Sequence, residues 1–170
     1  VLIIDPGDDA EYIIDKIIQE KLTPLTILAT HGHFDHIMGA WLIQKNFNIP
    51  FYIHSKDQFL LDRIQETVTH FLGNIPALAP EKISYLKVTQ NPVFPNFNFQ
   101  LIETPGHTPG SVSYYFPSEN KIFSGDLIFK NGIHGRTDFS YCSEADIKKS
   151  ITKILTLPQS NQIFPGHEES

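Results

Sequence analysis

Four side chains able to bind a metal ion lie within six consecutive residues of this chain. They are His31, His33, Asp35 and His36, in the run His-Gly-His-Phe-Asp-His. The 8 histidines of a 170-residue chain would rarely gather so closely by chance. In a tight turn, residues i and i+2 can face one ion while i+4 and i+5 face a neighbouring ion. The run therefore predicts the beginning of two metal sites.

Further candidate ligands stand at three separate positions. His107 follows Thr-Pro-Gly and His167 follows Pro-Gly, so proline and glycine restrict both loops. Asp126 offers a carboxylate whose two oxygens can bridge ions about 3.5 to 4 Å apart. The donors are nitrogen and oxygen with no thiolate, which fits Zn²⁺, Fe²⁺, Mn²⁺ or Co²⁺ without selecting among them. A water held between two such ions loses a proton near neutral pH, which predicts hydrolytic chemistry.

Other polar residues have weaker claims to a role. Asp5 precedes Pro-Gly and is either a turn residue or, as we expect, a carboxylate that orients a ligand histidine through its second ring nitrogen. Isolated histidines such as His54 and His70 are expected to be surface or structural residues. Cys142 has no histidine near it in sequence and is expected to be inert. A single cysteine forms no internal disulfide, which predicts a reducing, cytoplasmic compartment.

The elements that must position these ligands follow from the hydrophobic pattern. Apolar residues at helical spacing predict helices over 10–18, 37–47, 56–63 and 143–155, with Asp8 or Asp9 as the first N-cap and Ser143 as the last. Apolar runs and alternation predict strands over 25–30, 51–54, 97–101, 112–116, 122–123 and 162–164. The strands in the second half form a meander. Strand exits at Thr30, Glu103, Ser124 and Pro165 are each followed closely by a His or Asp, so one rim should collect the ligands.

This order of elements predicts an α+β fold, an αββα sandwich of two mixed β-sheets flanked by helices. With 170 residues the chain predicts one domain over 1–170, since domains commonly span about 100 to 200 residues. The net charge of −6, without a clustered basic face, argues against a nucleic-acid partner. Apolar runs are far shorter than the roughly 18 residues of a membrane span, so no membrane partner is expected. The apolar first residues and the end soon after His167 suggest a chain trimmed at both ends.

Taken together, several motifs resemble the metallo-β-lactamase fold superfamily over nearly the whole chain. Their order and spacing are most similar to its glyoxalase II (hydroxyacylglutathione hydrolase) branch, of the short single-domain type. The motifs are Asp5, the run 31–36, Thr-Pro-Gly-His-Thr-Pro-Gly-Ser at 104–111, Ser124-Gly125-Asp126 and Pro165-Gly166-His167.

The resemblance implies two divalent ions, with zinc expected first and iron or manganese as alternatives. One metal would take His31, His33 and His107, the other Asp35, His36 and His167, and Asp126 would bridge them. Asp35, His36 and Asp126 are the expected catalytic residues. The implied reaction is hydrolysis of a small-molecule thioester derived from glutathione, such as S-lactoylglutathione.

The main alternative is the persulfide dioxygenase branch, an oxidoreductase class that uses one iron. It shares the histidine motif and a segment similar to Gly135–Phe139 (Gly-Arg-Thr-Asp-Phe). That branch typically has alanine before its last histidine, whereas Gly166 stands here, which favours the hydrolase. True β-lactamases are less similar, because many of them place a cysteine where this chain has Asp126. A metal-free binding module is a distant third alternative.

The expected substrate-binding elements depart from long glyoxalase II enzymes. Those enzymes carry a C-terminal helical domain that grips glutathione, and the sequence ends at Ser170 without one. Arg136 stands where they place a basic residue on the glutathione carboxylate, and we expect it to bind the substrate's anion. Glu169 replaces an expected tyrosine, and His134 is an additional residue in the loop. Such departures are similar to short glyoxalase II-like hydrolases, whose substrates vary.

Overall fold

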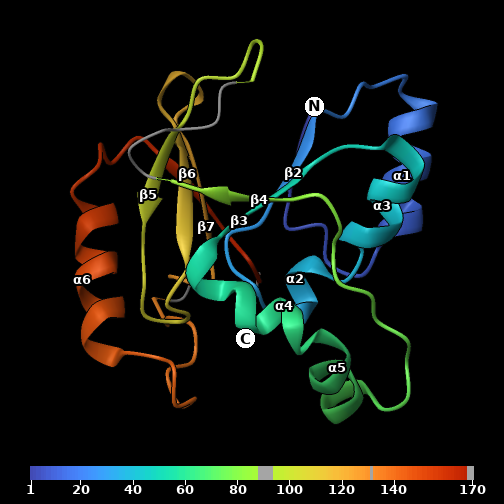
Figure 1. The fold of residues 1–170 in the computed structure, drawn as a ribbon. Helices are drawn as coiled ribbons and strands as arrows, with labels where there is room; N and C mark the ends of the chain where they lie inside the picture. Colours follow the sequence, from blue (N-terminus) through green and yellow to red (C-terminus); the bar gives the residue numbers. More distant parts are fainter. Residues whose placement is uncertain (88–93, 131, 168–170) are drawn as a thin grey trace. The chain divides into compact units, whose positions relative to one another are not determined.

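A computed structural model describes residues 1–87, 94–130 and 132–167. The chain divides into two compact units, Val1–Tyr85 and Leu86–Ser170, and each is described by itself. The elements of the first unit alternate between strands and helices along the chain (Figure 1). They are β1 (Leu2–Ile4), α1 (Ala10–Gln19), β2 (Thr26–Leu28), α2 (Phe34–Ile37), α3 (Ala40–Phe47), β3 (Phe51–His54), the 3₁₀ turn η1 (Ser55–Asp57), α4 (Gln58–Asp62), α5 (Ile64–Leu72) and β4 (Ile83–Leu86).

The first sheet has the strand order β1-β2-β3-β4. Strand β2 pairs in parallel with β1 and with β3, and all three of its residues are buried, which explains its apolar, β-branched sequence. Helix α1 packs Ala10, Ile14 and Ile17 into the same core, as its helical spacing predicts. Parallel strands bring their carboxyl ends to one edge, so the loop after β2 and the turn after β3 lie next to one another.

The predicted helix 37–47 is in fact two helices, α2 and α3, separated at Met38–Gly39. The reason is tertiary: the Gly39 N–H donates to the Gly7 carbonyl at 2.6 Å, and a Cβ at position 39 would lie 3.0 Å from that oxygen. The predicted helix 56–63 is likewise divided into η1 and α4, and α5 follows where no helix was predicted. Asp9 is the N-cap residue of α1 but makes no side-chain capping bond.

The second unit holds a mixed sheet with the strand order β5-β6-β7-β8. Strands β5, β6 and β7 pair antiparallel in succession, which confirms the meander, and β8 pairs in parallel with β7. The predicted strand 97–101 begins later, at Gln100. The elements are β5 (Gln100–Glu103), β6 (Val112–Phe116), the 3₁₀ turn η2 (Pro117–Glu119), β7 (Lys121–Gly125), α6 (Glu144–Leu155) and β8 (Gln162–Pro165).

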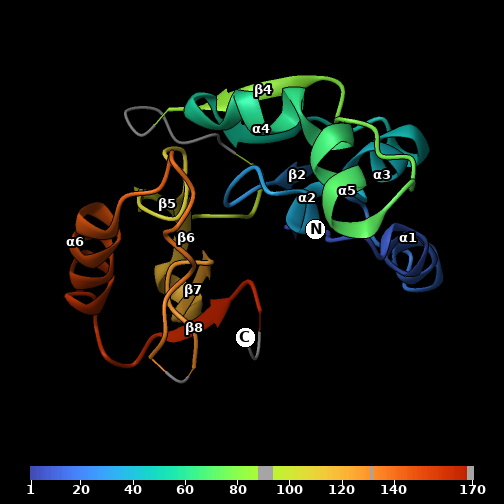
Figure 2. The ribbon, with the colours of Figure 1, turned by 90° about the horizontal axis from the view of Figure 1, so that it is seen from below.

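Helix α6 covers one face of this second sheet (Figure 2). Ile147 and Ile154 of α6 pack with Tyr115 and Ile122 of the strands in one buried cluster. The helix begins as predicted, because the Ser143 side chain accepts a hydrogen bond from the Asp146 N–H. This helix start also lies beside the loop that carries His107, which matters for the site.

The architecture confirms the predicted α+β class with two sheets and flanking helices. Among the described residues, no helix is both long and apolar enough to cross a membrane. The prediction of a single domain stays a prediction.

Candidate metal centre

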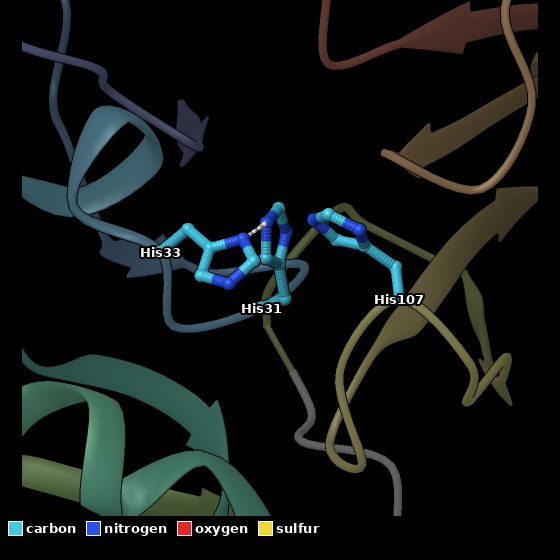
Figure 3. Close-up of side chains that lie close together, drawn as sticks. All are labelled: His31, His33 and His107. Atoms are coloured by element: carbon cyan, nitrogen blue, oxygen red, sulfur yellow. Dashed lines mark hydrogen bonds between the residues drawn. The ribbon is translucent and has the colours of Figure 1, made fainter. Parts of the chain in front are cut away.

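The histidine run begins three residues after β2 ends, at its carboxyl end as predicted. His31 is fully buried, and its Nε2 lies 3.0 Å from Nδ1 of His33 (Figure 3). Two nitrogens bound to one tetrahedral Zn²⁺ at 2.0–2.1 Å lie about 3.3 Å apart. These two ring nitrogens therefore stand at the spacing that two ligands of one ion require.

Asp5 holds Nδ1 of His36 directly and Nδ1 of His31 through Thr30. Its Oδ1 accepts from the Thr30 N–H at 2.7 Å, and its Oδ2 accepts from the Thr30 hydroxyl at 2.6 Å. The same Oδ2 lies 2.9 Å from Nδ1 of His36. Since the Thr30 hydroxyl gives its proton to Asp5, it accepts one from Nδ1 of His31, 3.0 Å away. Both histidines are thus held with Nδ1 protonated and Nε2 as the nitrogen for a metal.

The remaining residues of the run lie on α2. His33 is the N-cap residue of this short helix, Asp35 is exposed in its first turn, and His36 is buried. One potential ligand atom each from Asp5, His31 and His36 fall within 4.8 Å of one another. Because both Asp5 oxygens already accept hydrogen bonds, the geometry suits Asp5 to orienting the histidines rather than to binding a metal itself.

In the second unit, Asp126 lies close to two histidines. Its Oδ2 is 3.5 Å from Nε2 of His107 and 3.6 Å from Nε2 of His167. Asp126 follows β7, His107 follows β5, and His167 follows β8, so three strand ends supply this cluster. A carboxylate oxygen at similar distances from two imidazole nitrogens is a candidate for a ligand shared by two ions.

The loop that carries His107 is fixed by α6 and the residues that precede it. The Pro105 carbonyl accepts from the Ser150 hydroxyl at 2.7 Å, and the Gly106 carbonyl accepts from the Ser143 N–H at 2.8 Å. Gly106 has φ +143°, and a Cβ there would lie 2.3 Å from the Ile147 backbone nitrogen. Only glycine allows this close approach of the loop to the helix.

The His107 ring is oriented by the backbone of Arg136. Nδ1–H of His107 donates to the Arg136 carbonyl at 2.9 Å, which leaves Nε2 on the side of Asp126. Gly135 lies against Asp126 and His107, since its N–H donates to the Asp126 carbonyl and a Cβ would lie 2.2 Å from that oxygen and 2.9 Å from Nδ1 of His107. Sequence reasoning missed these two contacts because a backbone carbonyl and a glycine N–H carry no signature of their partners.

The Arg136 side chain is engaged within its own loop. Its Nε and Nη2 donate to the two Asp138 oxygens at 2.6 and 2.5 Å, and its guanidinium lies 4.2 Å from the Phe139 ring centroid. The Arg136 hydrogen bonds lower the pKa of Asp138 to about 2. An anion that binds Arg136, as the sequence predicts, would therefore compete with Asp138.

The other residues considered from the sequence have local partners. His54 is buried and its Nδ1 accepts from the Lys56 N–H, a structural role, while His70 is exposed beside Phe71. Burial raises the pKa of the Cys142 thiol, whose Sγ–H donates to the His107 carbonyl. His134 Nδ1 lies 2.8 Å from the Gly135 carbonyl. Glu169 lies outside the described residues.

The fold and the clustered ligands define the class of protein. The chain belongs to the metallo-beta-lactamase superfamily, whose family model matches residues 1–167. It is therefore a member of a family of metallo-hydrolases with a metal-binding histidine cluster. The resemblance seen in the motifs is confirmed.

One named relative and two solved structures are similar to the chain over most of its length. The chain is 35% identical to the hydroxyacylglutathione hydrolase GloC of Haemophilus influenzae, over 97% of this chain and 78% of that protein. Its structure is similar to that of TTHA1623 in a di-iron-bound form, with a TM-score of 0.87 and 33% identity over 96% of this chain and 80% of that one. It is also similar to the B3 metallo-beta-lactamase BLEG-1, with a TM-score of 0.89 and 38% identity over 98% of this chain and 80% of that one.

Proposed function

We propose that this chain is a dinuclear metal hydrolase that acts on a glutathione-type thioester. The observation that carries the proposal is the position of Asp126, whose Oδ2 lies at similar distances from His107 and His167. In the proposed centre one ion takes His31, His33 and His107, and the other takes Asp35, His36 and His167. Asp126 is the ligand that the two ions share.

The donor set suits divalent ions of borderline character. Imidazole nitrogens with carboxylate oxygens bind zinc, iron and manganese, and zinc is our first expectation. The relative found in a di-iron-bound form supports a two-metal centre and keeps iron open. When bound, such ions generate a nucleophile from water near neutral pH and act as Lewis acids toward a carbonyl.

The protein's own contribution is orientation. Asp5 and Thr30 fix the ring nitrogens of His31 and His36, while the Arg136 carbonyl fixes His107. Ligands held in this way lose little freedom when they bind a metal, and the anionic Asp5 raises the basicity of His36. Asp35, His36 and Asp126 are the residues we assign to the catalytic centre.

The thioester assignment rests on two supports. The relative GloC is named as a hydroxyacylglutathione hydrolase, and the chain matches most of its length. Arg136 offers a guanidinium at an exposed loop position, where it can bind a carboxylate of the substrate once Asp138 is displaced. The single cysteine, Cys142, favours a reducing compartment, and we place this activity in the cytoplasm.

The test is metal analysis of the purified protein together with three assays. S-Lactoylglutathione hydrolysis is followed by release of free thiol, oxygen consumption is measured with glutathione persulfide, and hydrolysis of a β-lactam is followed by absorbance. Two metals per chain with thioester turnover supports the proposal. One iron with oxygen consumption would identify the dioxygenase alternative, and dominant β-lactam turnover would align the chain with the B3 relative. His31→Ala should lose metal and activity, whereas His70→Ala, at an exposed histidine, should lose neither.

A further inference from the structure

Asp57 is a fully buried carboxylate at the end of η1. Its Oδ2 accepts a hydrogen bond from the Gly32 N–H at 3.0 Å, across 25 residues of sequence. A buried carboxylate is costly unless strong hydrogen bonds compensate for its lost hydration. The Gly32 N–H belongs to the residue that separates His31 from His33.

The contact between the two loops is also sterically tight. A Cβ at Gly32 would lie 3.2 Å from Cβ of Asp57 and 3.0 Å from Cβ of Leu60. The backbone of the histidine loop therefore rests directly on η1 and the start of α4. Parallel pairing of β2 with β3 brings the two loops to the same sheet edge, where the Ala29 N–H donates to the Tyr52 carbonyl at 2.9 Å.

We infer that Asp57 is a positioning residue for the metal site that contains His31 and His33. It anchors the peptide group between them, and so holds Nε2 of His31 and Nδ1 of His33 at their 3.0 Å separation. The inference rests on the proposed function, because it assumes that these two nitrogens bind one ion. Asp57 acts through the backbone, and nothing in its sequence position, outside every histidine motif, points to this role.

Asp57 differs from Asp5 in what it holds. Asp5 bonds to His36 and, through Thr30, to His31, which belong to different ions of the proposed centre. Asp57 instead accepts from the Gly32 N–H, between two residues that the proposal assigns to the same ion. Loss of the Asp57 carboxylate should therefore weaken one metal and leave the other, whereas loss of the Asp5 carboxylate should weaken both.

The experiment compares Asp57→Ala with Asp57→Asn in the metal-loaded protein. Alanine removes the acceptor without adding volume, while the asparagine side-chain oxygen can still accept from Gly32. Chelator competition should show one of two metals bound about 10- to 100-fold more weakly in Asp57→Ala, the range found when outer partners of metal ligands are removed. Asp57→Asn should bind that metal less than about 10-fold more weakly than the wild type. The visible absorption of the Co²⁺-substituted protein should change in the alanine variant and return in the asparagine variant.

The matched control is Asp62→Ala, since Asp62 is an exposed acid on α4 that accepts from Gln58. It should leave both metals unchanged. If Asp57→Ala does not fold, Gly32→Ala tests the same contact from the other side and should loosen the same metal. The inference is overturned if the folded Asp57→Ala and Gly32→Ala variants bind both metals as tightly as the wild type does. It is also overturned if Asp57→Asn loses as much metal affinity as Asp57→Ala. If His31→Ala keeps both metals, it is the proposed centre that fails.

Discussion

The Asp5 carboxylate lies 2.9 Å from Nδ1 of His36, 31 residues away in sequence. Asp5 holds this position with φ 44°, in the left-handed region that few non-glycine residues adopt, although Asn, Asp and His do so more often than the others. In this conformation both side-chain oxygens of Asp5 accept hydrogen bonds. Asp5 directly follows β1, so the bond ties the end of the first strand to α2 and the histidine run.

Replacing Asp5 with asparagine should weaken metal binding and hydrolysis by about 10- to 100-fold. Asparagine tolerates the same backbone conformation, so the change removes the charge and one acceptor without new strain. Metal content after dialysis and kcat for the thioester are the measurements. Asp8→Asn, at an exposed neighbouring acid, is the control and should behave like the wild type. Unchanged metal affinity in Asp5→Asn would show that Asp5 is only a turn residue.

Replacing Asp126 with alanine should abolish metal-dependent hydrolysis. The substitution removes the oxygen that lies 3.5 and 3.6 Å from the two histidine nitrogens, and with it the anion that offsets repulsion between two cations. Metal analysis should find at most one metal per chain. The isosteric Asp126→Asn should also lose activity while keeping the fold, which circular dichroism checks. Two metals and full turnover in Asp126→Ala would remove the bridging role.

Much of the candidate site was predictable because its histidines and carboxylates follow strands. The apolar sequence of β2 and the Pro-Gly-His segments indicate where strands end and which histidines follow them. The helical periodicity of α6 and its Ser143 N-cap were sufficient to place that helix. For Asp5 the sequence left two interpretations, a turn residue or a carboxylate that orients a histidine, and the structure places its Oδ2 2.9 Å from Nδ1 of His36.

The features that the sequence could not predict depend on contacts of a backbone group with a residue far away in the sequence. The break between α2 and α3 arises where Gly39 meets Gly7, and no helical period records that contact. The Asp57 bond to Gly32 and the Arg136 carbonyl beside His107 are of the same kind. Each pairs a backbone group with a residue at least 25 positions away, so the tertiary fold must be known first.

Replacing Gly135 with alanine should lower metal affinity and activity. The new Cβ would lie 2.2 Å from the Asp126 carbonyl oxygen and 2.9 Å from Nδ1 of His107, so the loop must move and both ligands with it. Gly132→Ala is the control, because nothing lies within 4 Å of a Cβ there and its φ of +79° costs only stability, about 1–2 kcal/mol. Thermal unfolding and metal titration of both variants separate the two effects. A loss of activity in Gly132→Ala as large as in Gly135→Ala would contradict the prediction.

The ion pair of Arg136 with Asp138 should depend on pH in a defined direction. The pKa of Asp138 is lowered to about 2 from 3.8 by the Arg136 hydrogen bonds. A lowered carboxyl pKa means that the pair is complete above about pH 4 and is lost as the pH falls through about 2. Carboxyl carbon shifts measured by NMR should give that midpoint, and Arg136→Gln should return it toward 3.8. A midpoint that stays near 2 in the variant would assign the shift to another cause.

Removing Asp138 should in turn improve binding of an anionic substrate. Asp138→Asn frees the Arg136 guanidinium from its bidentate partner, and exposed pairs of this kind contribute little because solvent screens them. KM for a glutathione thioester should therefore fall by up to about fivefold while kcat stays the same. Arg136→Gln should raise KM, and high salt should reduce both effects because the groups are exposed. If KM is the same in all three proteins, the substrate carboxylate binds elsewhere and Arg136 serves the site only through its carbonyl at His107.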